Sequence, residues 1–136
     1  MITEDYVSFE VAKLLKEKGF DWICSGYWYS KENNTEKGLA VSSLPANHND
    51  DEYRRFDLPI SAPTHQMAMK WLREVHKLTF IISPQWAEGD MRNPCRWYWE
   101  VRGLRDITTD VYSNPLCDSY EEAIEAALRY SLENLI

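Results

Sequence analysis

Histidine and cysteine are the residue types of this chain that most readily bind metal or attack a substrate. The chain holds three of each. They are His48, His65, His76, Cys24, Cys95 and Cys117. Structural zinc sites take their ligands from short pairs such as CxxC or HxxxH, and no such pair occurs here. We therefore expect no metal site.

Nucleophilic and nucleotide chemistry find equally little support. A cysteine nucleophile needs a histidine base beside it, which one sequence cannot reveal, and the strand pattern around Cys24 favours a small buried apolar side chain. The five glycines form no GxGxxG, GxxxxGK[ST] or GxSxG motif, so no backbone cradle for a phosphate is evident. We expect no cofactor and no catalytic residue, and a non-enzymatic protein in preference to an enzyme.

Aromatic side chains are the unusual feature, with six Trp, eight Tyr and four Phe. Many lie in two alternating segments, 22–29 and 95–102, that read as strands. If helices cover one face of a sheet, rings on the other face meet solvent or another chain. The residues of this predicted interaction surface are Trp22, Tyr27, Trp28, Tyr29, Tyr98, Arg96 and Arg102. The alternative is that the rings only fill the core.

Three helices must position these strands. Ser8 can cap a helix from 8 to 18 that stops at Gly19, and Ser119 with Glu122 forms a capping box for a helix to about residue 135. Between them, a helix from about 64 to 76 has an apolar stripe of Met67, Ala68, Trp71, Leu72 and Val75.

Further strands are expected at 39–44, 78–83 and 107–112, the last weakly, with an acidic surface loop at 45–59. The order is then α-β-β-α-β-β(-β)-α. Helices on one face of an antiparallel sheet suit this order, so we predict an α+β fold with one sheet of about four to five strands and three helices. A length of 136 residues is typical of one domain, so we expect a single globular domain over 1–136.

The net charge of −7 disfavours nucleic acid as a partner, because affinity for phosphates comes from cations. The odd cysteine count and the lack of a basic-then-apolar leader predict free thiols in the cytoplasm. No apolar run approaches the roughly 20 residues that span a bilayer, so we expect a soluble protein without a membrane partner.

The segments from Ala62 to His76, from Ser119 to Ala123 and from Val7 to Phe20 carry a resemblance. In these segments the chain resembles small bacterial proteins of prophage or mobile-element type, for which no activity is assigned. The resemblance implies no catalytic residue.

Three functions remain open at this point. The first is an accessory protein that binds a protein partner, or itself, through the aromatic sheet face. The second is a small enzyme or ligand-binding protein with a pocket near His65, Trp71 and His76. The third is an acidic mimic of nucleic acid, favoured only by dispersed carboxylates.

Overall fold

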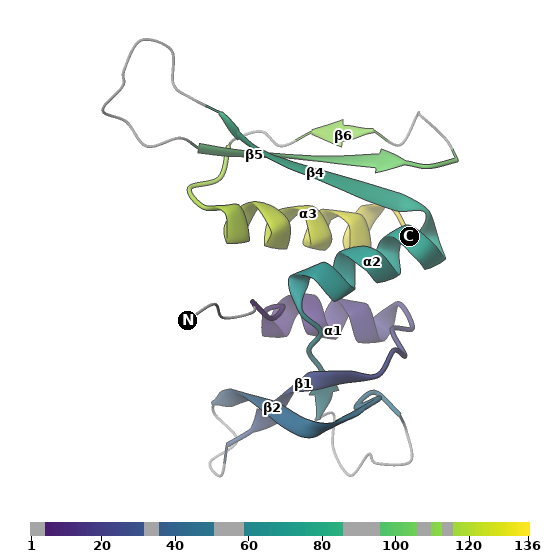
Figure 1. Ribbon diagram of the computed structural model, residues 1–136, viewed down its shortest axis with the longest axis vertical. Coiled ribbons are helices and arrows are strands. Elements are labelled where there is room, and N and C mark those ends of the chain that lie inside the picture. Colours follow the sequence, from purple (N-terminus) through teal and green to yellow (C-terminus); the bar gives the residue numbers. More distant parts are fainter. Residues whose placement is uncertain (1–4, 32–35, 51–58, 86–95, 106–109, 113–115) are drawn as a thin grey trace. The chain divides into compact units, whose positions relative to one another are not determined.

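The computed structural model (Figure 1) describes residues 5–31, 36–50, 59–85, 96–105, 110–112 and 116–136. The chain divides into two compact units, Met1–Ala68 and Met69–Ile136, and each is described by itself. The described residues form three helices and six strands, which confirms the predicted α+β class and the order of its main elements. The strands do not share one sheet as we expected, because they form two three-stranded sheets.

The first unit opens with helix α1, Phe9–Glu17. Ser8 caps it as predicted, since its side chain accepts a hydrogen bond from the Val11 amide at 3.2 Å. The helix stops at Gly19, whose φ of 90° suits a residue without a Cβ. Phe20 follows fully buried, and Val11 and Leu15 form the buried stripe.

The sheet of the first unit has the order β2-β1-β3, with every neighbouring pair antiparallel. Its strands are β1, Cys24–Ser30, β2, Lys37–Ala46, and β3, Ile60–Ser61. Helix α1 lies on the face that carries Trp28, because the Trp28 indole donates a hydrogen bond to the Val7 carbonyl at 3.1 Å and meets the Phe9 ring edge-on. On this same face a Cβ at Gly26 would clash with the Ala62 carbonyl and the Tyr6 ring, so only glycine fits there.

Helix α2, His65–His76, begins in the first unit and ends in the second. Ala68, Trp71 and Leu72 are buried as predicted. Val75 is half exposed, which corrects its place on the predicted core stripe. It lies in the last turn of the helix, and the chain then leaves the helical path at Lys77, whose φ is 58°.

The second unit has the sheet order β4-β5-β6, again antiparallel throughout. Its strands are β4, Leu78–Gln85, β5, Arg96–Gly103, and β6, Val111–Tyr112. Helix α3, Tyr120–Asn134, follows its predicted cap, with the Ser119 hydroxyl accepting from the Glu122 amide at 3.1 Å. Of the weak strand predicted at 107–112, residues 107–109 lie outside the described part of the chain.

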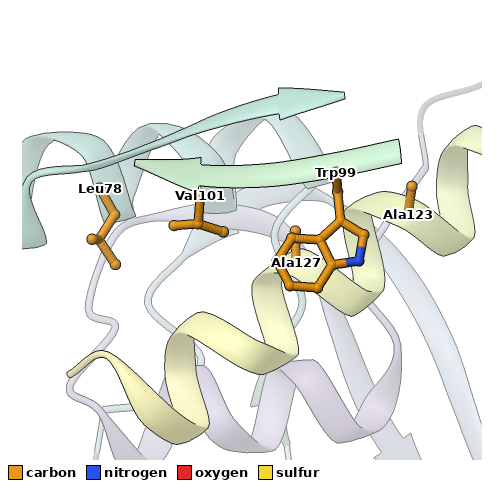
Figure 2. Close-up of a cluster of buried hydrophobic side chains, with 5 residues drawn as sticks. All are labelled: Leu78, Trp99, Val101, Ala123 and Ala127. Atoms are coloured by element: carbon orange, nitrogen blue, oxygen red, sulfur yellow. The ribbon is translucent and has the colours of Figure 1, made fainter. Parts of the chain in front are cut away.

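The core of the second unit lies between β5 and α3. Figure 2 shows Trp99 and Val101 directed from β5 toward the helix, where Ala123 and Ala127 face them. The two alanines let the helix backbone approach the sheet, so the large indole of Trp99 fills the space between them. This packing covers one face of the β4-β5-β6 sheet.

No helix in the described ranges is both long and apolar enough to cross a bilayer.

Candidate functional site

Six of the seven residues of the predicted interaction surface lie on two different sheets, and the seventh, Trp22, lies just before one of them. In the first unit Trp28 is on the α1 face, and Trp22 precedes the strand and contacts Phe20 with ring centroids 6.4 Å apart. Tyr27 and Tyr29 point to the opposite face, where the ring of Tyr29 lies over Gly38. Arg96, Tyr98 and Arg102 belong to β5 in the second unit.

Along β5 the side chains alternate between two faces of the sheet. Trp97, Trp99 and Val101 face the core with α3, so the intervening residues point to the other face. The strand register places Ile81 and Tyr112 on either side of Glu100, and Ser83 and Thr79 beside Tyr98 and Arg102. We call this surface the Glu100 face; it consists of Thr79, Ile81, Ser83, Arg96, Tyr98, Glu100, Arg102 and Tyr112.

Glu100 is a buried carboxylate in the middle strand of this face, with only 4% of its surface exposed. The Nε–H of Arg102 donates to its Oε1 at 2.7 Å, and the Tyr98 hydroxyl donates to Oε2 across 3.4 Å. Removing a carboxylate from water costs several kcal/mol unless a cation and hydrogen bonds replace the water. The short bond to Arg102 is therefore the main compensation for burying Glu100.

The electrostatics of the Glu100 face keep its donors protonated. Burial raises the pKa of Tyr98, and the nearby Glu100 carboxylate raises it further. The hydrogen bond and charge of Glu100 also raise the pKa of Arg102. Tyr98 thus stays a neutral phenol and Arg102 a cation over the physiological range.

Around the buried carboxylate the side chains are accessible. Arg96 and Tyr112 are more than half exposed, Arg102 about half, and Ile81 about a third. The Tyr98 and Tyr112 rings lie 6.1 Å apart, and the Nε of Arg96 lies 3.9 Å from Oδ1 of Asp118. Tyrosine and arginine on a firm sheet are the residue types that carry most binding energy at protein interfaces.

A second polar cluster, which no sequence motif indicates, lies in the first unit. The loop after β2 brings His48 and Asn49 to β1 and β3. The Nε2–H of His48 donates to the Cys24 carbonyl at 3.2 Å, its backbone N–H donates to the Ser61 hydroxyl at 2.9 Å, and its ring lies 4.7 Å from that of Tyr27. Asn49 bonds the Phe20 carbonyl and the Ser61 amide, both at 2.9 Å.

Cysteine, histidine and asparagine meet here, as in some thiol enzymes, but their contacts are those of a clamp. The Cys24 thiol donates to the Gly26 carbonyl at 3.4 Å, and burial raises its pKa. The imidazole of His48 bonds the backbone of Cys24. A nucleophilic thiol needs the opposite conditions, a lowered pKa and an adjacent base. We conclude that this cluster fixes the loop onto the sheet.

The residues of the predicted pocket all lie on α2. His65 is buried in the first unit, and its backbone N–H donates to the Asp5 carbonyl at 2.9 Å. Trp71 and His76, in the second unit, meet edge-on with ring centroids 4.7 Å apart. Within the described ranges, no three His, Cys, Asp or Glu side chains gather as a metal site would require.

No family model, no curated protein and no solved structure matches the chain. The resemblance to prophage-type proteins therefore stays a prediction.

Proposed function

We propose that the protein is a non-enzymatic interaction protein that binds a protein partner through the Glu100 face. The observation that carries this proposal is the 2.7 Å contact between buried Glu100 and half-exposed Arg102, set among exposed Tyr112, Arg96 and Ile81. A charged pair costs desolvation energy that an apolar pair would avoid. This desolvation cost is explained if the contact with Glu100 fixes the orientation of the Arg102 guanidinium and a partner then binds that guanidinium.

The chemistry of the face suggests what the partner presents. Arg96 and the outer part of Arg102 offer guanidinium donors, which recognise carboxylates. Tyr112 and Ile81 offer apolar area next to them. The matching surface is a protein segment with one or two carboxylates beside an apolar side chain. The net charge of −7 weighs against a nucleic acid in the same place.

The state of the potential reactive groups supports binding over catalysis. The Glu100 carboxylate is buried and held by Arg102, and the Cys24 thiol is buried with a raised pKa. Both groups make contacts that stabilise the folded chain.

The test uses a photo-crosslinking amino acid placed at Tyr112 and, as a matched control, at exposed Glu121 on α3. A protein captured in cells from position 112 and not from 121 is then purified, and its affinity for the wild-type chain is measured by calorimetry. Tyr112→Ala and Arg96→Ala should each weaken binding about ten-fold or more, as expected for interface hot spots. Arg129→Ala on α3 should leave the affinity unchanged.

Two results would contradict the proposal. One is capture of the same proteins from positions 112 and 121. The other is an affinity that stays at the wild-type value in both Tyr112→Ala and Arg96→Ala.

A further inference from the structure

The β2 strand is the long edge strand of the first unit. It pairs with β1 along one side, and the sheet order β2-β1-β3 leaves its other side without a neighbouring strand among the described residues (Figure 1). Backbone N–H and C=O groups along a sheet edge can be satisfied in a regular way only by another extended chain.

The hydrogen bonds of β1 reveal which residues of β2 face the open edge. The Gly26 carbonyl accepts from Ala62 on the β3 side, and the Lys31 amide donates to Glu36 on the β2 side. Because backbone groups alternate in direction along a strand, Tyr27 and Tyr29 bond toward β2, and their partners Ala40 and Gly38 bond back. The residues whose backbone groups point outward are therefore Lys37, Leu39 and Val41.

The side chains of all three residues are exposed as well. Leu39 is 40% exposed and Val41 58%, although both lie on the face that carries Trp28. The regular edge ends just beyond Val41, where the register with β1 shifts and the Leu44 amide bonds the Ser42 hydroxyl. The edge thus offers a five-residue stretch, 37–41, with Leu39 at its centre.

We propose that this edge pairs with the β2 strand of a second copy of the chain, antiparallel and related by a two-fold axis at Leu39. Leu39 then faces Leu39 of the second copy, and Lys37 faces Val41. Every outward residue meets another outward residue, so each facing pair can exchange two backbone hydrogen bonds. The two sheets become one continuous six-stranded sheet. This contact uses a different sheet from the Glu100 face and is independent of the function proposed above.

The β2 edge is complementary to itself, and this identifies a second copy of the chain as its partner. A two-fold axis at Lys37 would set two ammonium groups face to face, which is unfavourable. An axis at Val41 would extend the pairing to Pro45, which has no amide hydrogen, across the irregular part of the strand. The axis at Leu39 avoids both problems and brings the exposed apolar side chains of the two copies together.

Cysteine trapping tests the register. Under mild oxidation Leu39→Cys should form a disulfide-linked dimer well above the wild-type background, because the two Cα atoms would lie about 5.5 Å apart. Lys37→Cys should stay at background, since its two copies would be separated by about four residues, roughly 13 Å along the strand. A mixture of Lys37→Cys and Val41→Cys should again form the linked dimer. Equal trapping at positions 37 and 39, or none above background at 39, would overturn the proposal.

Charge substitutions at one position give a second readout by analytical ultracentrifugation. Val41→Lys should weaken the dimer at least ten-fold because it faces Lys37 of the second copy, while Val41→Glu should bind about ten-fold more tightly than Val41→Lys. Leu44→Lys adds the same charge to β2 beyond the contact and should change the dissociation constant less than three-fold. A wild-type chain that stays monomeric at about 100 μM, or equal weakening by Val41→Lys and Val41→Glu, would overturn the proposal.

Discussion

Arg102 holds the carboxylate of Glu100 from two residues away on the same strand, with Nε and Oε1 2.7 Å apart. The carboxylate is buried, whereas the guanidinium is about half exposed. Residues two apart share a face of a strand, so this contact needs no distant element to form. The burial of Glu100, in contrast, depends on neighbours from β4 and β6.

Arg102→Ala should lower the melting temperature more than Glu100→Gln, even though Arg102 is the more exposed residue. Without Arg102 the buried carboxylate loses its cation and, among the described residues, keeps the Tyr98 hydroxyl as its hydrogen-bond donor, whereas without the charge on Glu100 the guanidinium can be solvated by water. Differential scanning calorimetry of both variants and of the double variant measures this. The double variant should recover part of the loss. A larger drop in melting temperature for Glu100→Gln than for Arg102→Ala would contradict the conclusion that Arg102 compensates the burial of the Glu100 carboxylate.

Trp71→Ala should destabilise the fold by about 3–5 kcal/mol, the range for a large buried aromatic side chain. Trp71 is 2% exposed and contacts His76. Val75→Ala on the same helix is the matched control and should change the free energy of unfolding by less than about 0.5 kcal/mol, because Val75 is half exposed. Urea unfolding followed by circular dichroism checks both. Comparable losses in the two variants would mean that the buried side of α2 has been misassigned.

His48 should make the fold less stable in acid. Burial lowers the pKa of His48 from 6.5, despite its hydrogen bond to the Cys24 carbonyl. Between the lowered pKa and about 6.5 the unfolded chain binds more protons than the folded chain, so stability rises with pH there. The contribution is fully present above pH 6.5 and is lost as the pH falls through the folded pKa.

The measurement for His48 is the melting temperature from pH 4.5 to 8, compared between the wild type and His48→Gln. The difference between the two should shrink as the pH falls through this window. A difference that stays constant over the whole range would exclude the assigned role.

The thiols of Cys24 and Cys117 should be inert in the folded protein. Burial raises the pKa of both Cys24 and Cys117, which lowers the fraction of reactive thiolate at pH 7. Iodoacetamide labelling followed by mass spectrometry should modify Cys24 only when urea unfolds the chain. In a separate thermal-unfolding measurement, adding chelator and reductant should leave the melting transition in place, as the cysteine spacing predicts. Rapid labelling of Cys24 in the native state would instead indicate an activated thiol.

Local signals in the sequence were enough to predict the three helices and most strands of this fold, but not the short strand β3, Ile60–Ser61. Ser8 and Ser119 cap helices where their spacing indicates, because a cap depends on atoms within one turn. The alternation along β5 correctly separates Trp97, Trp99 and Val101 from Tyr98 and Arg102, because a strand turns every second side chain to the same face.

Only the tertiary structure decided how these elements combine. Alternation identifies the two faces of a strand but contains no information about which strand lies beside it, so the division into two sheets could not be predicted. The clamp of His48 and Asn49 joins residues 12 to 29 positions apart, and Glu100 is enclosed by Ile81 and Tyr112 through pairing with two other strands. These contacts form because burial and hydrogen bonding are satisfied across the whole unit, which no short segment of sequence specifies.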